Sequence, residues 1–105
     1  MGVDPVDYKA ASVDEDDLKF AAQMGATHVV LQSYADAGIV KGDARWEYDD
    51  LLQLRRKVES AGLVLEALEN VPLKFYDQVM LGGPDRDRQI ENMVYTVRNI
   101  ARAGI

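Results

Sequence analysis

Hydrophobic residues are spaced in two ways along this chain: as short continuous runs, and as stripes that repeat every three or four positions. The continuous runs lie at residues 26–32 and 63–69, and each follows a glycine, Gly25 or Gly62. Apolar runs of this length, placed between helices, are typical of strands buried in a parallel sheet. We therefore predict two such strands and take the second, Leu63 to Glu69, as the central element of the fold.

The stripes predict amphipathic helices at about residues 12–24, 49–61 and 85–103. The first begins at Ser12-Val13-Asp14-Glu15, which has the form of a capping box. The other two are each predicted to bury one apolar face, comprising Leu51, Leu54, Val58 and Ala61 in one, and Ile90, Met93, Val94, Val97, Ile100 and Ala101 in the other. Residues 33–45 and 73–83 are interpreted as loops. Residues 1–11 are weakly patterned, and we expect a weakly structured loop there or at most an edge strand.

The three predicted helices end alike, at Gly25, Gly62 and Gly104. These glycines recur with a period of roughly 40 residues, as expected of stacked βα units, eight of which close a TIM barrel. We therefore predict a single domain, residues 1–105, of the α/β class: a partial (β/α) TIM-barrel fragment with about two and a half βα units and parallel strands. Because Gly104-Ile105 repeats the pattern of Gly62-Leu63, a further strand is expected to follow, with a frayed C-terminus as the alternative.

Charge and composition restrict the partners and the location. The net charge of -6 argues against nucleic acid or an anionic membrane surface as the main partner. The chain has no cysteine, its start lacks the pattern of a signal peptide, and no apolar run approaches membrane-spanning length. We expect a soluble, cytoplasmic protein.

Two residues are candidates for substrate binding. Ligands of parallel sheets bind beyond the carboxyl ends of the strands, where Glu69 and Asn70 fall. Glu69 is the first candidate, and its alternative role is to cap the loop that follows. Arg86, at the start of the last helix, is the second, because a guanidinium beside helix amides can hold a carboxylate through two hydrogen bonds. The alternative for Arg86 is a solvated ion pair with Asp85 or Asp87.

Other chemistry is not predicted. His28 is the only histidine, and a metal site needs several converging ligands, so we interpret it as a structural strand residue and predict no metal site. Trp46 could line a sugar site, or it could pack against Leu51 or Leu52 at the start of the second helix. No nucleophile has an adjacent base, so no catalytic residue is assigned.

Several segments resemble the N-terminal part of mannonate dehydratases. They are Leu81–Asn92 (LGGPDRDRQIEN), Thr96–Ile105 (TVRNIARAGI), Gln23–Thr27 (QMGAT), and Ala61-Gly62-Leu63 leading to Glu69–Pro72 (ENVP). The resemblance implies a TIM barrel similar to that of xylose isomerases and the removal of water from D-mannonate to give 2-keto-3-deoxygluconate, a step of hexuronate catabolism. It also implies a glutamate at the position of Glu69. Mn²⁺ or Fe²⁺ is implied for the complete enzyme, with ligands on strands beyond Ile105, so that no cofactor is expected in this chain.

The function expected is that of an N-terminal fragment of a metal-dependent D-mannonate dehydratase, inactive on its own. A sugar-acid substrate is expected only when the barrel is completed. One alternative is a non-enzymatic, self-associating βα fragment, and another is part of a xylose-isomerase-like isomerase or epimerase. Because the apolar strands were expected to need cover on both faces, we predict a homo-oligomer, with a dimer favoured.

Overall fold

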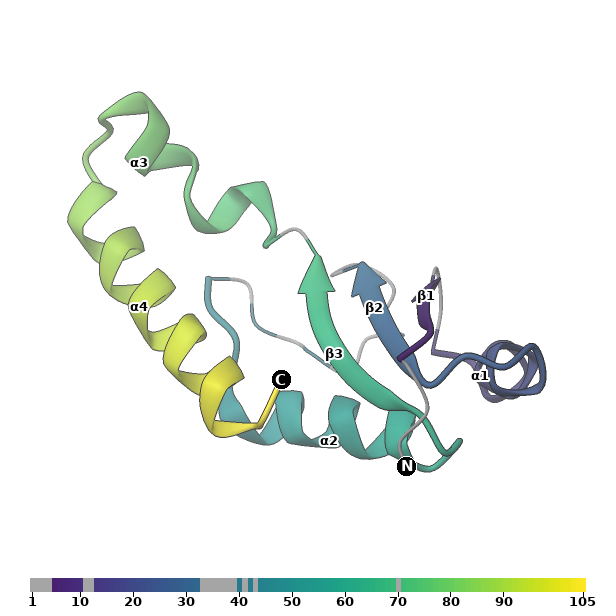
Figure 1. Cartoon of the computed structure of the whole chain (residues 1–105). Helices are drawn as coiled ribbons and strands as arrows, with labels where there is room; N and C mark the ends of the chain where they lie inside the picture. Colours follow the sequence, from purple (N-terminus) through teal and green to yellow (C-terminus); the bar gives the residue numbers. More distant parts are fainter. Residues whose placement is uncertain (1–4, 11–12, 33–39, 41, 43, 70) are drawn as a thin grey trace.

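Three strands alternate with helices in the computed structural model, which describes residues 5–10, 13–32, 40, 42, 44–69 and 71–105 (Figure 1). The elements are β1 (Asp7–Ala10), α1 (Glu15–Gln23), β2 (His28–Gln32), α2 (Tyr48–Glu59), β3 (Val64–Glu69), a 3₁₀ helix (Leu73–Phe75), α3 (Asp77–Leu81) and α4 (Arg86–Arg102). The order of strands and helices confirms the α/β class. None of the helices in these described ranges is long and apolar enough to cross a membrane.

The strands form one parallel sheet in the order β1-β2-β3. The weakly patterned N-terminal region therefore contributes an edge strand, β1, in which Asp7 is the register partner of His28 on β2. Thr27 secures this edge, because its hydroxyl accepts a hydrogen bond of 2.8 Å from the backbone N–H of Val6. Parallel strands joined through helices are the unit from which a TIM barrel is built.

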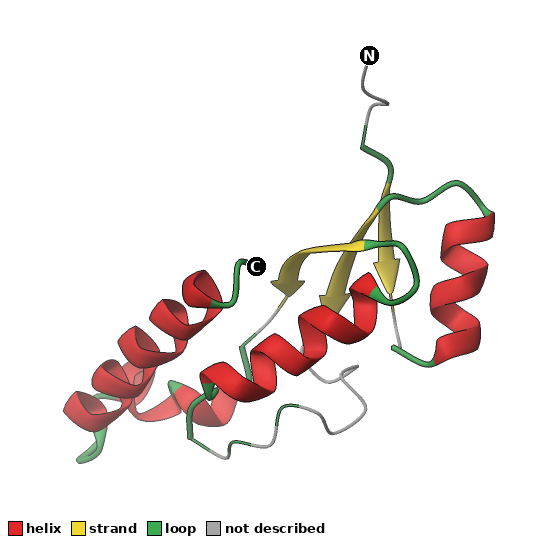
Figure 2. Ribbon diagram, turned by 90° about the horizontal axis from the view of Figure 1, so that it is seen from below, coloured by secondary structure: helices red, strands yellow, loops and turns green. Residues whose placement is uncertain are grey.

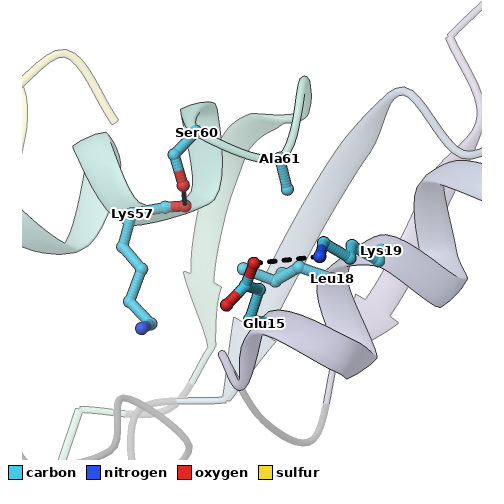
Figure 3. A pocket seen from close by; sticks show the side chains of 6 residues that line it. All are labelled: Glu15, Leu18, Lys19, Lys57, Ser60 and Ala61. Atoms are coloured by element: carbon cyan, nitrogen blue, oxygen red, sulfur yellow. Dashed lines mark hydrogen bonds and ion pairs between the residues drawn. The ribbon is translucent and has the colours of Figure 1, made fainter.

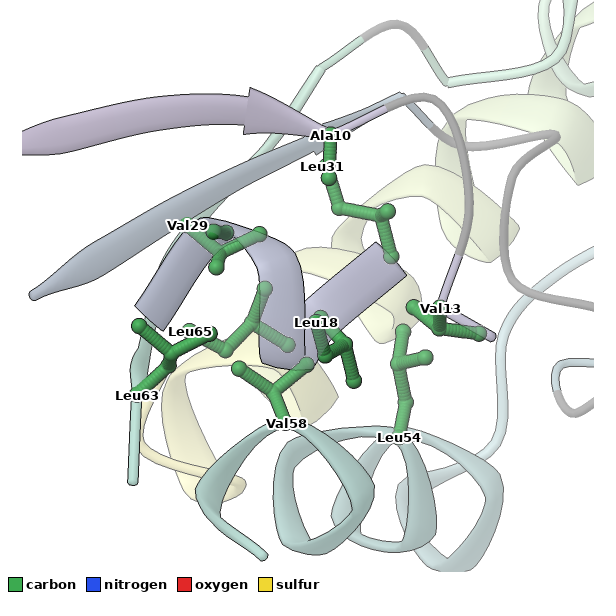
Figure 4. Packing of buried hydrophobic residues seen from close by; sticks show 10 residues of the cluster. Ala10, Val13, Leu18, Val29, Leu31, Leu54, Val58, Leu63 and Leu65 are labelled. Carbon is green, nitrogen blue, oxygen red and sulfur yellow. The ribbon is translucent and has the colours of Figure 1, made fainter. Parts of the chain in front are cut away.

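One layer of helices covers one face of the sheet (Figure 2). The main core lies between this face and helices α1 and α2 (Figure 4). Its largest buried side chains come from α1, α2 and the strands, and are Leu18, Val29, Leu31, Leu54, Val58, Leu63 and Leu65. The stripe of α2 is buried as predicted, at Leu51, Leu54 and Val58, because the helix presents it directly to this layer.

The helix ends also follow the sequence pattern. Gly25, Gly62 and Gly104 have φ angles of 93°, 81° and 79°, in the left-handed region that favours glycine. Helix α1 begins at Glu15, and within the described part of the chain no side-chain hydrogen bond caps its start. Ser12 lies outside the described residues, and the Glu15 carboxylate pairs instead with Lys19 at 2.9 Å.

A second, smaller core joins the C-terminal half of the chain to α2. Trp46, Leu51, Phe75 and Ala103 are buried together. The rings of Trp46 and Phe75 meet edge to face, with centroids 5.9 Å apart and planes inclined at 70°. This geometry is a favourable one for aromatic pairs. The cluster positions the long connection after β3 against the start of α2.

The prediction of which residues α4 buries is wrong in part. Ile90, Val94 and Val97 are exposed, and the helix instead buries Thr96 and Asn99. The reason is a pair of hydrogen bonds between α4 and the backbone of Trp46. The Trp46 N–H donates to the Thr96 hydroxyl at 3.1 Å, and the Asn99 side-chain amide donates to the Trp46 carbonyl at 2.9 Å. A buried backbone group needs such a partner, so these bonds set the rotation of α4 about its axis.

The segment predicted as a loop at residues 73–83 contains the 3₁₀ helix and α3. One side chain of α4, Gln89, organises it. The Gln89 carbonyl oxygen accepts from the backbone N–H groups of Gln78 and Val79 at 2.9 and 3.2 Å, and its amide donates to the Asp77 carboxylate at 2.7 Å. Gln89 thus supplies partners for the first N–H groups of α3, which lack partners within the helix.

Replacing Gln89 with alanine should lower the free energy of unfolding by about 1–2 kcal/mol, because several partly buried polar groups lose their partner. Urea denaturation measures the change. Gln53→Ala, at an exposed position of α2, is the matched control and should stay within about 0.5 kcal/mol of the wild type. Equal losses in the two variants would mean that Gln89 does not hold α3.

Candidate functional site at the carboxyl ends of the strands

The sheet face turned away from the helices is largely polar. Alternation along the strands places Asp7, Lys9, His28, Gln32, Glu66 and Glu69 on this side, together with the apolar residues Val30, Val64 and Ala67. This differs from the expectation that both faces are apolar. A register shift in β3 is part of the cause, since Val29 pairs with Leu65 and Val30 with Ala67, which leaves Glu66 as an extra residue.

Glu69 ends β3 on this polar face and meets a lysine from the far edge strand. The Lys9 ammonium lies 3.1 Å from Glu69 Oε1, with the two side chains 60% and 37% exposed. Glu69 Oε2 is buried and has no hydrogen-bond partner in the described part of the chain. The Lys9–Glu69 pair therefore spans all three strands near their carboxyl ends.

Arg86 lies at the first position of α4 and pairs with its neighbour Asp87, at 3.6 Å. Both side chains are well exposed, so this contact is the solvated ion pair considered from the sequence. The structure pairs Glu69 with Lys9 and Arg86 with Asp87. Helix α4 does begin on the side of the sheet toward which the strands point (Figure 1). Asn70 lies outside the described residues.

The other residues considered from the sequence have structural roles. Trp46 is 4% exposed and packs in the second core against Leu51, as its alternative interpretation proposed. His28 lies at the start of β2, with its Nδ1 2.7 Å from the Thr27 hydroxyl. Within the described ranges, no group of three or more histidine, cysteine, aspartate or glutamate side chains could hold a metal ion. These residues therefore do not fit the Mn²⁺ or Fe²⁺ that the resemblance implies.

Two carboxylates lie side by side on the polar face, nearer the amino ends of the strands. A hydrogen bond with Asp7, together with burial and the Asp7 charge, raises the pKa of Glu66 above its ordinary value of 4.5, while the nearby His28 opposes the shift. Glu66 therefore releases its proton at a higher pH than an ordinary glutamate does. The pair is a structural contact between β1 and β3, and Glu66 precedes Glu69 by three residues along β3.

This pair predicts a pH effect on stability. The folded state binds the Glu66 proton more tightly than the unfolded state, so the stabilisation is present at low pH and is lost as the pH rises through the raised pKa. The difference in unfolding free energy between wild type and Glu66→Gln should therefore change as the pH rises above 4.5. The wild type should lose stability relative to the variant over that interval. Parallel pH profiles would contradict the raised pKa of Glu66.

Two of the smaller hollows in the described part of the chain lie among the helices, outside the sheet face. One, of about 140 Å³, separates α1 from α2 and is lined by Glu15, Leu18, Lys19, Lys57, Ser60 and Ala61 (Figure 3). It lies in the helix layer, away from the strand ends. The other, of about 130 Å³, lies beside the start of α4 and is lined by Ala44, Lys74, Phe75, Asp85, Arg88, Gln89 and Asn92.

Sequence reasoning selected neither Lys9 nor Arg88. Lys9 falls in a region without a clear pattern, and its approach to Glu69 depends on how β1 pairs with the sheet. Arg88 lies within the alternating charges of residues 85–88, so the sequence alone does not distinguish it from Arg86. In the structure Arg88 differs from Arg86 because it lines the second hollow.

Comparison with known proteins agrees with this architecture. The family model of D-mannonate dehydratase (UxuA) matches residues 8–105. The mannonate dehydratase of Thermotoga maritima is 43% identical over 60 residues, which are 57% of this chain and 16% of that protein. The mannonate dehydratase of Streptococcus agalactiae is 42% identical over 60 residues, 57% of this chain and 17% of that protein. The matched segment thus spans about a sixth of these relatives. No solved structure gives a significant match.

Proposed function

Because this chain belongs to the D-mannonate dehydratase family, we propose that it forms the first strands and helices of a sugar-acid dehydratase barrel. The observation that carries the proposal is the Lys9–Glu69 pair, which joins β1 to β3 near their carboxyl ends. In TIM barrels the groups that meet the substrate stand at this end of the strands. The reaction proposed for the complete barrel is the removal of water from D-mannonate.

Glu69 and Lys9 have complementary roles in this proposal. Glu69 accepts a hydrogen bond from a substrate hydroxyl through its partly exposed carboxylate, while Lys9 holds Oε1 and fixes that group. A charged acceptor forms a stronger hydrogen bond than a neutral one, so this contact contributes to both affinity and orientation. Arg86, at the start of α4, is proposed to approach the substrate carboxylate once the barrel is closed.

The divalent metal belongs to the complete enzyme in this proposal. Mn²⁺ or Fe²⁺ would be held by residues outside those described here, and the described residues of this chain position the substrate. The cytoplasmic location also stays a prediction.

The test uses a graft in which this chain's residues 8–105, the range that the family model matches, replace the corresponding segment of the Thermotoga maritima relative. With Mn²⁺ added, the graft should convert D-mannonate to 2-keto-3-deoxygluconate, whereas the isolated chain should not. Turnover by the isolated chain would contradict the proposal that the site is incomplete without further strands. The same assay with a xylose-isomerase substrate separates the dehydratase from the isomerase alternative.

A further inference from the structure

The hollow of about 130 Å³ beside the start of α4, which we call the α4 hollow, gathers positive charge on an acidic chain. Two basic side chains, Lys74 and Arg88, contribute to its wall, against one acidic side chain, Asp85. The wall therefore has a net positive charge, whereas the whole chain carries -6. Such a hollow favours a negatively charged ligand.

Contacts within the chain fix the walls of the α4 hollow. Phe75 lines it, is 1% exposed and packs edge to face against the ring of Trp46. The Gln89 side chain joins α4 to the neighbouring segments, because its amide donates to the Lys74 carbonyl at 3.2 Å and its carbonyl oxygen accepts from the backbone N–H of Gln78 at 2.9 Å. The hollow is therefore formed before a ligand binds, which lowers the entropy cost of binding.

The α4 hollow lies on the inner side of its helix. Arg88, Asn92 and Asn99 are spaced by four and seven residues, so they share one side of α4. That side faces the rest of the chain, since the Asn99 amide donates to the Trp46 carbonyl at 2.9 Å. A neighbouring element that packs on the outer side of α4 would leave the hollow open.

Arg88 is the side chain in the α4 hollow best suited to bind an anion. It is exposed, and its guanidinium has no ion-pair or hydrogen-bond partner in the described part of the chain. A guanidinium donates two parallel hydrogen bonds to the oxygens of a carboxylate or a phosphate. The Asn92 amide, one turn further along α4, is a neutral donor to the same group, and Lys74 adds a second positive charge from the 3₁₀ helix.

The volume of the α4 hollow limits the size of the ligand. Pockets that enclose drug-sized ligands measure about 300–1,000 Å³. A hollow of about 130 Å³ therefore encloses only a small group. A carboxylate or a phosphate is of this size, and both present oxygens that accept from the same donors.

We propose that the α4 hollow binds a small oxyanion, a carboxylate or a phosphate group, through Arg88 and Lys74, with Asn92 as an additional donor. The proposal does not depend on the dehydratase activity, and it assigns a role to an arginine that the strand-end site does not use. Asp85 opposes binding by its charge, so the affinity is low, with a dissociation constant on the order of 1 mM.

NMR titration of the intact, isotope-labelled chain with sodium phosphate or sodium acetate, at constant ionic strength, tests the proposal. The amide signals of Lys74, Arg88, Gln89 and Asn92 should shift and reach saturation below about 50 mM. The anion that binds more tightly identifies the group that the hollow prefers.

Two variants test which charges act. Arg88→Gln should weaken binding at least about tenfold, the loss of a charge-assisted contact, while circular dichroism stays unchanged because the side chain is exposed. Asp85→Asn should strengthen binding about threefold, because it removes a like charge from the wall.

Arg98→Gln is the matched control. Arg98 is exposed on the same helix but does not line the α4 hollow, and at 1.5 Å per residue it lies about 15 Å from Arg88 along the axis. Exposed charges farther apart than about 8 Å are largely screened at physiological ionic strength, so this variant should bind within about twofold of the wild type. Equal losses in Arg88→Gln and Arg98→Gln would overturn the proposal in favour of general attraction to the surface. Shifts that do not saturate, or weaker binding in Asp85→Asn, would also overturn it.

Discussion

Replacing Glu69 with glutamine in the grafted enzyme is expected to lower kcat/KM for D-mannonate by roughly 10- to 100-fold, the loss of one hydrogen bond to a charged group. Glutamine keeps the size of the side chain and one carbonyl oxygen. It removes the charge that pairs with Lys9 at 3.1 Å and the second carboxylate oxygen, which is buried without a partner among the described residues. The change therefore weakens the proposed contact to the substrate hydroxyl and also removes the ion pair with Lys9.

Glu66→Gln in the same graft is the matched control. Glu66 lies on the same strand and the same face of the sheet, but its partner is Asp7, nearer the amino ends of the strands. Its replacement should change kcat/KM by less than about threefold. If the two variants lose activity equally, the site is not located at the carboxyl end of β3.

The largest expected effect on stability comes from the second core. Phe75→Ala should lower the free energy of unfolding by about 3–5 kcal/mol, because Phe75 is 1% exposed and its removal leaves a cavity against Trp46. For a small domain this is a large share of the total stability. Urea unfolding followed by circular dichroism gives the free energy, and the fluorescence of Trp46, the only tryptophan, reports whether the cavity admits water.

Phe20 provides the control for this experiment. It is the only other phenylalanine and is 53% exposed on α1, so Phe20→Ala should change stability by no more than about 0.5 kcal/mol. A loss below about 1 kcal/mol for Phe75→Ala would mean that the second core contributes little to holding α4 against α2.

The sequence predicts the elements better than it predicts the contacts between them. The strands β2 and β3 and the ends of the helices follow from local signals, namely continuous apolar runs and glycines such as Gly62 that adopt a left-handed conformation. These signals act within a few residues, so a single sequence shows them. The edge strand β1 is harder to predict from the sequence. Its residues alternate between the buried face and the exposed face of the sheet, so they form no continuous apolar run.

The face buried by α4 could not be predicted from periodicity. The apolar positions Ile90, Val94 and Val97 form the most regular stripe in the chain, yet the hydrogen bonds of Thr96 and Asn99 to Trp46 turn that stripe outward. The partners in these bonds are about 50 residues apart, and nothing local in the sequence indicates them.

The candidate site, too, could be predicted from the sequence only in part. The position of Glu69 at the end of a parallel strand follows from the run that precedes it. Its partner Lys9 does not, because the pair forms across three strands whose register includes the irregularity at Glu66. Long-range pairs of this kind depend on strand register, which a one-residue shift changes completely.

The most direct test of the proposal that this chain builds the first part of a dehydratase barrel is the rate of D-mannonate dehydration by the graft. The proposal predicts production of 2-keto-3-deoxygluconate with kcat/KM within about tenfold of the Thermotoga maritima parent, since a tenfold change in rate corresponds to only about 1.4 kcal/mol. A graft that folds with the circular dichroism spectrum of the parent, binds Mn²⁺ and still gives no product would contradict it.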